Sequence, residues 1–228
     1  GIEAAKATVD RLGARKINTA NVPVLLHRDI ASSLFGHYVG AISGGSLYRR
    51  SSFLLDSLGK QVFPEWLNIE ERPFIKGGLA SSSFDNEGVA CSDMTIVDGG
   101  KLATYLYTTY SSRKLNTRSN GHAGGIHNWL VGDTGHSDAD LLKEMGTGLF
   151  VTELMGQGVN GVTGDYSRGA AGYWVENGII QYPVHEVTIA GNLKDMFKGI
   201  VAIGAEKDVR GSVQTGSVLI DQMKIAGS

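Results

Sequence analysis

The sequence predicts one β-rich domain with three or four short helices. Glycine makes up 32 of the 228 residues and proline only 4, and such an excess of glycine is typical of a chain with many turns and hairpins. Asp98-Gly99 and Asn177-Gly178 each lie between runs of strand-forming residues. Because both central residues of a tight hairpin turn need positive φ, these dipeptides favour antiparallel strands joined by short turns.

Several segments have the pattern of a helix. Residues 2–15 and 29–42 carry apolar side chains on one face, and the second pattern is expected to stop at the Ser-Gly-Gly-Ser of 43–46. Ser137 is the expected N-cap of a helix through Met145, with Asp140 near the capping-box position. A further short helix is expected to start at Asn192 and to end at Phe197 or Lys198.

Strands are expected in the remaining apolar runs. Pro64 and Pro73 interrupt the irregular region 58–78, in which we expect no long element. The predicted strands and hairpins lie at 23–26, 89–108, 173–184, 218–220 and 223–225.

Charge and cysteine content exclude several classes of protein. The formal net charge is −2, without a basic run long enough to hold a nucleic-acid backbone. The single cysteine, Cys91, can form neither an internal disulfide nor a thiolate zinc site by itself, which favours a reducing compartment and hence the cytoplasm. No run approaches the roughly 18 apolar residues of a membrane span, and no signal peptide is visible.

The six histidines do not form a complete zinc-peptidase motif. Such a helix needs two imidazoles on one face and a carboxylate beside the first, whereas His27 is followed by Arg28. His122 and His127 lie in the glycine-rich stretch 121–128. They are expected either to bind a metal or shape a ligand pocket, or to be exposed imidazoles on a tight connection between strands, and the second interpretation is favoured.

A second glycine-rich stretch, residues 164–172, concentrates polar groups before a predicted strand. Its backbone amides can hold an anion or a peptide carboxylate, or Asp165 and Arg168 can form a local ion pair that stabilises the loop. Cys91 is interpreted as a packed thiol, and no serine-nucleophile or nucleotide-binding motif is present. The residues by themselves therefore indicate no complete catalytic set.

Five segments of the chain carry a resemblance to a known family: GHYVGAISGGSLYRRSSFLLDSLGK (36–60), GHAGGIHNW (121–129), KEMGTGLFVTELMGQGVNGVTGDYSRGAAGYWVENGIIQYPV (143–184), AGNLKDM (190–196) and MKIAGS (223–228). Through these segments the chain resembles the carboxy-terminal half of the TldD/PmbA peptidase family, on its PmbA (TldE) branch. The resemblance implies a single C-terminal domain over 1–228, with the amino-terminal α/β domain of the family absent from this chain, which begins with Gly1. It also implies an α+β, β-rich fold with antiparallel strands curled into a barrel-like sheet and a few short peripheral helices.

The resemblance implies a cytoplasmic bacterial zinc peptidase complex. In this family the TldD branch holds zinc through H-E-x-x-x-H and a later cysteine, and it pairs with the PmbA branch as a heterodimer. The pair carries out proteolysis of small or unfolded peptides, including maturation of microcin-type peptide antibiotics and degradation of an antitoxin. An older description of the branch is modulator of DNA gyrase.

The zinc motif is degenerate in this chain. His27 matches the first ligand, Arg28 replaces the glutamate, Ser32 replaces the second histidine, and Thr215 falls where the cysteine is expected. A lone imidazole beside a cation holds zinc poorly. We therefore expect no catalytic residue, metal or other cofactor in this chain, and zinc in a TldD-type partner.

These observations predict a non-catalytic subunit that holds an extended peptide as an added strand. Expected partners are a TldD-type paralogue and peptide substrates, with a homodimer for the isolated chain and no direct contact with nucleic acid or membrane. Two alternatives are a self-sufficient hydrolase with an unrecognised site and a regulatory protein that binds DNA gyrase without proteolysis. The predicted peptide-binding residues are Gly121, His122, Gly124, Gly125, His127, Asp165 and Arg168.

Overall fold

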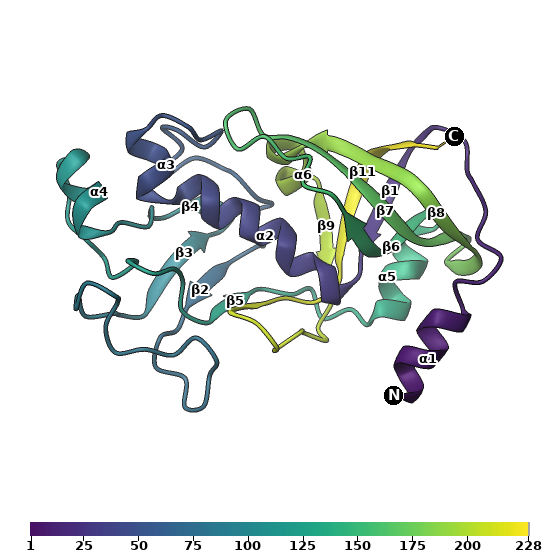
Figure 1. The fold of residues 1–228 in the computed structure, drawn as a ribbon, viewed down its shortest axis with the longest axis horizontal. Helices are drawn as coiled ribbons and strands as arrows, with labels where there is room; N and C mark the ends of the chain where they lie inside the picture. Colours follow the sequence, from purple (N-terminus) through teal and green to yellow (C-terminus); the bar gives the residue numbers. More distant parts are fainter. Residues whose placement is uncertain (228) are drawn as a thin grey trace.

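The computed structural model describes residues 1–227 and contains a small β-barrel joined to a second, five-stranded sheet (Figure 1). The barrel closes because β11 pairs with both β8 and β1. β9 (Ile200–Ile203) extends the barrel sheet along β11. The five barrel strands are β1 (Ala20–Leu26), β6 (Gly148–Met155), β7 (Asp165–Glu176), β8 (Ile179–Asn192) and β11 (Val218–Ala226).

The structure confirms the β-rich α+β class and the barrel-like sheet. It differs from the expectation in one barrel pair, because β1 and β6 run parallel. Parallel neighbours need a long crossover connection, and here the chain between β1 and β6 forms most of the second sheet on its way. The predicted hairpin at Asn177-Gly178 joins β7 to β8, with φ of +52° and +74° at the two turn residues.

The second sheet lies beside the barrel and has very short strands. The predicted hairpin around Asp98 is confirmed, although its second strand has only two residues. A three-residue strand lies at 69–71, inside the region where no long element was expected, and its Ile69 is buried in the core. In sheet order the strands are β10 (Val213–Gln214), β5 (Trp129–Val131), β2 (Ile69–Glu71), β3 (Met94–Asp98) and β4 (Lys101–Leu102).

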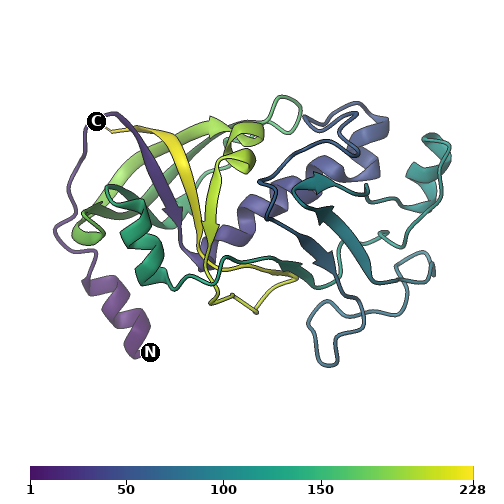
Figure 2. The same ribbon diagram turned by 180° about the vertical axis from the view of Figure 1, so that it is seen from behind.

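Helix α2 (Arg28–Ile42) connects the two sheets through one shared core. Figures 1 and 2 show it running from the barrel towards the second sheet. The fully buried ring of Tyr38 lies 4.9 Å from Phe63, 6.1 Å from Trp129 and 5.7 Å from Phe197, measured between ring centroids. Because these rings come from both halves of the molecule, packing against α2 holds the barrel and the second sheet together.

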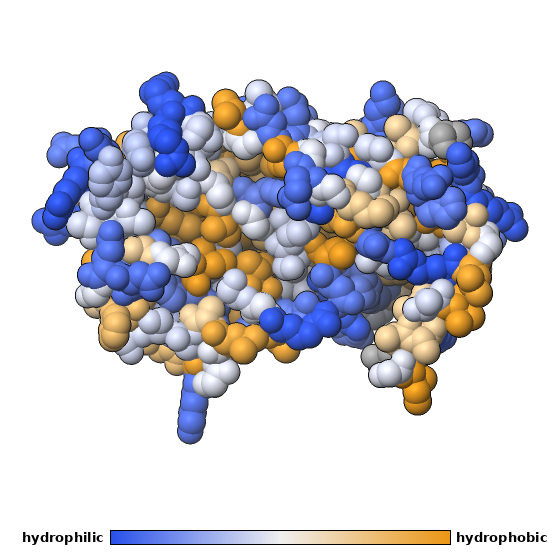
Figure 3. All heavy atoms as spheres, in the orientation of Figure 1, coloured by the Kyte–Doolittle hydropathy of each residue, from blue (hydrophilic) through white to orange (hydrophobic). Residues whose placement is uncertain are grey.

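Two helices differ from the sequence prediction. Helix α1 (Ile2–Val9) is shorter than 2–15. Val9 at its end and Leu12 just beyond it are exposed, so within residues 1–227 no tertiary packing extends the helix. Figure 3 shows orange atoms at the lower right, where Figure 1 places α1. The glycines of 43–46 end α2 as predicted but also begin α3 (Gly44–Tyr48), for which the Ser43 hydroxyl is the N-cap.

The other helices agree with the expected boundaries or are new. Helix α5 (Asp138–Met145) has the predicted capping box of Ser137 and Asp140, and it packs on the outside of the barrel beside β1 (Figure 2). Helix α6 (Leu193–Lys198) is capped by Asn192 as expected. Helix α4 (Thr109–Lys114) was not predicted. Among residues 1–227, no helix has the length and apolar character that crossing a bilayer requires.

Candidate functional site

The positions that the resemblance aligns with zinc ligands lie together at the amino-terminal end of α2. His27 is the N-cap of this helix, and its Nδ1 accepts a hydrogen bond of 3.4 Å from the amide of Asp29. The amide of Arg28 donates to the hydroxyl of Ser217, two residues beyond Thr215, at 3.1 Å. The fold therefore brings the 27–28 and 215–217 segments side by side.

The side chains at these positions do not fit a zinc ion. The Arg28 guanidinium pairs with Glu206 and lies 3.8 Å from Asp138, and its hydrogen bond to Glu206 raises the pKa of Arg28 above the usual value. The buried Thr215 hydroxyl donates to the carbonyl of Gly216 at 3.2 Å. Within the described part of the chain, side chains able to share a metal ion gather at one place, and His27 is not among them.

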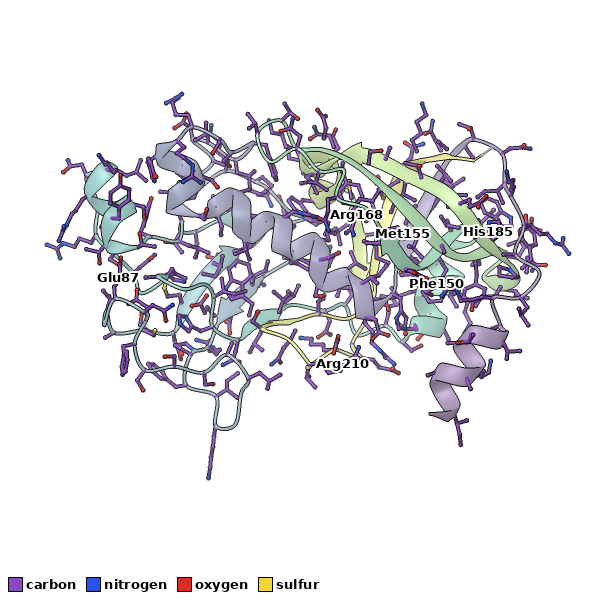
Figure 4. All side chains as sticks on the ribbon, in the orientation of Figure 1. Glu87, Phe150, Met155, Arg168, His185 and Arg210 are labelled. Atoms are coloured by element: carbon purple, nitrogen blue, oxygen red, sulfur yellow. The ribbon has the colours of Figure 1, made fainter. Side chains whose placement is uncertain are left out.

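A cavity of about 480 Å³ opens beside His27. The ring of Phe150 lies 5.7 Å from the His27 ring and 6.3 Å from that of Tyr173, so one wall is aromatic. Arg210 pairs with Asp29 on the other side of the helix end. Figure 4 shows Phe150 and Arg210 on opposite sides of this end of α2. The cavity is thus lined by aromatic and polar groups without a set of metal ligands.

The glycine-rich loop 121–128 turns its two histidines inward. Gly121, Gly124 and Gly125 have φ of +81°, +110° and +128°, a conformation that favours glycine. His122 and His127 are 6 % and 9 % exposed. The expectation of two exposed imidazoles is therefore wrong, because the loop folds over the second sheet and the rings meet a buried carboxylate there.

That carboxylate belongs to Glu71 at the end of β2, which is 1 % exposed. Its Oε1 lies 2.9 Å from Nδ1 of His127 and 3.1 Å from Nε2 of His122, and its Oε2 accepts a hydrogen bond from the indole of Trp129. Burial by itself raises the pKa of Glu71, but its interactions with His122, His127 and Trp129 outweigh burial, and the pKa is below its usual value. The carboxylate is therefore the charged centre of this cluster.

An asparagine orients the ring of His122. The Asn120 amide nitrogen donates to the Tyr105 carbonyl at 2.8 Å, and Asn120 Oδ1 accepts from the Tyr107 amide at 2.7 Å. Those two bonds identify Oδ1 as the acceptor, and it lies 2.9 Å from Nδ1 of His122. His122 therefore carries a proton on Nδ1.

Asp85 and Cys91 support the same loop. The buried Asp85 carboxylate accepts hydrogen bonds of 2.9 Å from three backbone amides, including that of Ala123. Burial alone raises the pKa of Asp85, but the amides lower it overall. Cys91 is buried with Sγ 3.5 Å from Nε2 of His127, and burial, with the charges of Asp85 and Glu71, raises the pKa of its thiol. A packed, protonated thiol agrees with this environment, whereas a nucleophile needs a lowered pKa.

The other predicted peptide-binding residues lie on the barrel. Asp165 accepts hydrogen bonds from the Thr163 hydroxyl and the Asn192 amide, which lower its pKa. Arg168 donates to the carbonyl of Gly156 at 3.1 Å. In residues 1–227 these two side chains do not form the expected ion pair with each other.

The predicted peptide-binding set is thus divided between the two halves of the molecule. Figure 4 shows Arg168 on the barrel, far from Glu87. The amide of Asn86, the residue before Glu87, donates to the carbonyl of Ala123 in the loop of His122 and His127. Sequence reasoning missed Glu71, Asn120 and Asp85, since no spacing in the sequence connects them to the two histidines.

Comparisons with known proteins agree with the resemblance. Residues 19–227 match the family described as PmbA/TldA metallopeptidase C-terminal domain. The chain is 59% identical over 227 residues to "Metalloprotease PmbA" of Escherichia coli O157:H7, covering 100% of this chain and 50% of that protein. The chain thus spans about half the length of the curated relatives it matches.

Two solved structures have the same fold. A Bacteroides thetaiotaomicron protein, described as a proposed modulator of DNA gyrase, has a TM-score of 0.95 and 26% identity, over 100% of this chain and 52% of that chain. TldE from Thermococcus kodakarensis has a TM-score of 0.87 and 21% identity, over 99% of this chain and 55% of that chain. The second likeness, at this identity, concerns the fold alone.

Proposed function

Because this chain belongs to the PmbA/TldA metallopeptidase family, we propose that it is part of a non-catalytic subunit of a zinc peptidase complex. The peptidase zinc lies in a TldD-type paralogue with which the subunit forms a heterodimer. The observation that carries this proposal is the state of the family's zinc positions. The hydrogen bond from the Arg28 amide to Ser217 brings the segments of His27 and Thr215 side by side, but Arg28, paired with Glu206, stands at the position where the resemblance places the glutamate.

The role proposed for the subunit is to bind extended peptide by main-chain hydrogen bonds. Such binding reads the backbone rather than the side chains and suits a broad range of sequences. The glycine-rich stretch 121–128 beside the second sheet and the stretch 164–172 on the barrel are proposed as two separate contact regions. The main chain of 165–172 is already paired with β6 and β8, so this stretch contributes its accessible side chains Asp165 and Arg168. The buried His122 and His127 would act through the conformation of their loop.

The substrates proposed are small or unfolded peptides, including precursors of microcin-type antibiotics and an antitoxin, in the cytoplasm. Direct contact with nucleic acid or membrane is not part of the proposal, since the net charge is −2 without a long basic run.

A reconstitution experiment tests the subunit proposal. This chain and a TldD-type paralogue are assayed separately and together on an unstructured peptide, with and without a chelator. We expect cleavage only by the mixture, and its loss on chelation. Chelator-resistant cleavage by this chain alone would contradict the proposal and would indicate a self-sufficient hydrolase.

The peptide-contact surface has its own test in the same assay. Arg168→Ala and Asp165→Ala should raise the KM for peptide several-fold and leave assembly unchanged. Arg113→Ala, an exposed change on α4, is the matched control and should have no effect. Unchanged KM in both barrel variants would exclude this surface while leaving the subunit proposal standing.

A regulatory role without proteolysis is the second candidate. It is favoured by the description of the Bacteroides thetaiotaomicron relative as a proposed modulator of DNA gyrase. The regulatory role predicts that this chain binds purified gyrase in the absence of any TldD-type partner. We expect no such binding, and a stoichiometric complex would favour this candidate.

A further inference from the structure

Glu71, His122 and His127 form a buried cluster whose chemistry the proposed peptide-binding role does not use. We propose that these three side chains bind one divalent cation of the Zn²⁺ type, at a site separate from the family's degenerate zinc positions. The proposal does not depend on the peptidase role. It departs from the sequence-based expectation of a chain without cofactor and develops the alternative, less favoured from the sequence, that His122 and His127 bind a metal.

The donor set is the first argument. Two imidazoles and one carboxylate are a combination that binds zinc and related transition metals. One ligand atom from each side chain lies within 4.8 Å of the other two. With Zn–N and Zn–O bonds of about 2.0–2.2 Å, the ligand atoms of a tetrahedral ion lie about 3.4 Å apart. The observed 2.9 Å and 3.1 Å from Glu71 Oε1 to the two ring nitrogens need only a small outward shift.

Hydrogen-bond accounting at His122 is the second argument. Asn120 Oδ1 is an acceptor, so the proton of a neutral His122 ring is on Nδ1. The lone pair on Nε2 then faces a carboxylate oxygen, which repels it. Although Nε2 is buried and 3.1 Å from Glu71 Oε1, it has no aligned hydrogen bond in the described structure. A cation between His122 Nε2 and Glu71 Oε1 would be bound by the lone pairs of both atoms.

The surroundings hold the three side chains as metal ligands are usually held. A histidine ligand normally donates its second ring N–H to a carbonyl or carboxylate, and a carboxylate ligand is itself hydrogen-bonded. Here Asn120 Oδ1 accepts the hydrogen bond from the second ring nitrogen of His122, and the Trp129 indole donates a hydrogen bond to the Glu71 carboxylate. Asp85 anchors the loop between the histidines through the amide of Ala123.

Burial indicates a structural role for the ion. The side chains of Glu71, His122 and His127 are 1 %, 3 % and 11 % exposed, and the cavity beside His27 does not include them. A bound ion would attach the 121–128 loop to the end of β2 and so stabilise the second sheet. Cys91 contacts His127 at Nε2, the nitrogen that faces away from Glu71, and is therefore not expected in the coordination shell.

Metal content provides the test. Bound metal is removed from the chain with a chelator, and the chain is then incubated with Zn²⁺ alone. After unbound Zn²⁺ has been removed, the number of zinc ions per chain is measured by native mass spectrometry. We expect one zinc per chain. Glu71→Gln and His122→Asn should abolish retention, and Asn120→Leu should weaken affinity by about 10–100-fold. The matched controls His27→Asn and His185→Asn should retain the ion.

X-ray absorption on the unaltered zinc-loaded chain keeps the test independent of whether variants fold. We expect nitrogen and oxygen neighbours with imidazole scattering and no sulfur. A sulfur ligand, or loss of zinc in His27→Asn with retention in His122→Asn, would overturn the assignment. The assignment would also be overturned if the chain held no stoichiometric zinc and the His122 ring were protonated on both nitrogens. In that case an ion pair between the His122 imidazolium and the Glu71 carboxylate would satisfy the hydrogen-bonding groups of the cluster.

Discussion

Two buried tyrosines differ in whether the hydroxyl group has a hydrogen-bond partner, so removal of each oxygen should change stability in opposite directions. Tyr38 on α2 is fully buried, and its hydroxyl has no partner within residues 1–227. Burial raises the pKa of this hydroxyl far above its usual value. The Tyr105 hydroxyl, in contrast, donates to the Leu54 carbonyl at 2.8 Å and accepts from the Ser57 amide at 2.8 Å.

The magnitudes follow from these contacts. A buried polar group without a partner costs about 1–3 kcal/mol, whereas the void left by one oxygen, smaller than a methyl group, costs less than about 1 kcal/mol. Tyr38→Phe should therefore raise the free energy of unfolding by about 1 kcal/mol. Tyr105→Phe leaves the buried Leu54 carbonyl unpaired, while water can reach the half-buried Ser57 amide, so a decrease of about 2 kcal/mol is expected.

Urea unfolding at neutral pH measures both changes. The midpoints should move in opposite directions with unchanged slopes, because neither substitution alters the surface exposed on unfolding. A loss of more than about 1 kcal/mol in Tyr38→Phe would refute the reasoning, since it would mean that the hydroxyl has a favourable partner, such as a buried water. Equal effects in the two variants would refute it as well.

Two further predictions concern the barrel and the loop of the proposed ion site. In Gly172→Ala the new Cβ would lie 1.9 Å from the Phe150 carbonyl oxygen, so β6 and β7 must separate and a loss of at least about 2 kcal/mol is expected in thermal unfolding. Gly36→Ala has open space within α2 and should gain about 0.5–1 kcal/mol; similar losses in both would contradict the steric argument. Asp85→Asn should lower stability at pH 7 by about 1–3 kcal/mol, because an amide nitrogen replaces an acceptor of buried backbone N–H groups. Since the folded pKa of Asp85 is lowered, its contribution is present above the unfolded pKa and lost as pH falls through the folded pKa, so wild type and variant should converge below about pH 4. A stability difference independent of pH would contradict that assignment.

The elements predicted correctly are those whose determinants lie within a few residues. Asn177 and Gly178 adopt the positive φ values that a tight hairpin needs, and the flanking strands follow. Ser137 and Asp140 form their capping box through mutual hydrogen bonds three residues apart. Such contacts are made by neighbours in the chain, so composition and spacing are enough to predict them.

The elements that were predicted incorrectly or not predicted at all depend on packing. Residues 2–15 have a helical pattern, but Val9 and Leu12 are exposed and do not pack on an apolar surface of residues 1–227, and the helix ends at Val9. β2 is only three residues long and has no recognisable pattern, and its position is set by pairing with β3 and β5. The parallel pairing of β1 with β6 likewise depends on how the whole intervening chain folds.

The site around His27 and the cluster around Glu71 likewise differ in how much of each could be predicted from the sequence. The motif around His27, with Arg28 and Ser32 in place of ligands, is visible in the sequence through its likeness to a family, and the structure adds that Arg28 is paired with Glu206. The sequence determines the glycines of the 121–128 loop and the two histidines between them. Only the tertiary structure decides that these histidines point inward to Glu71, which lies 56 residues before His127. A contact over that separation depends on the register of β2 beside β5 and on burial in a shared core, and neither is encoded in the spacing of neighbouring residues.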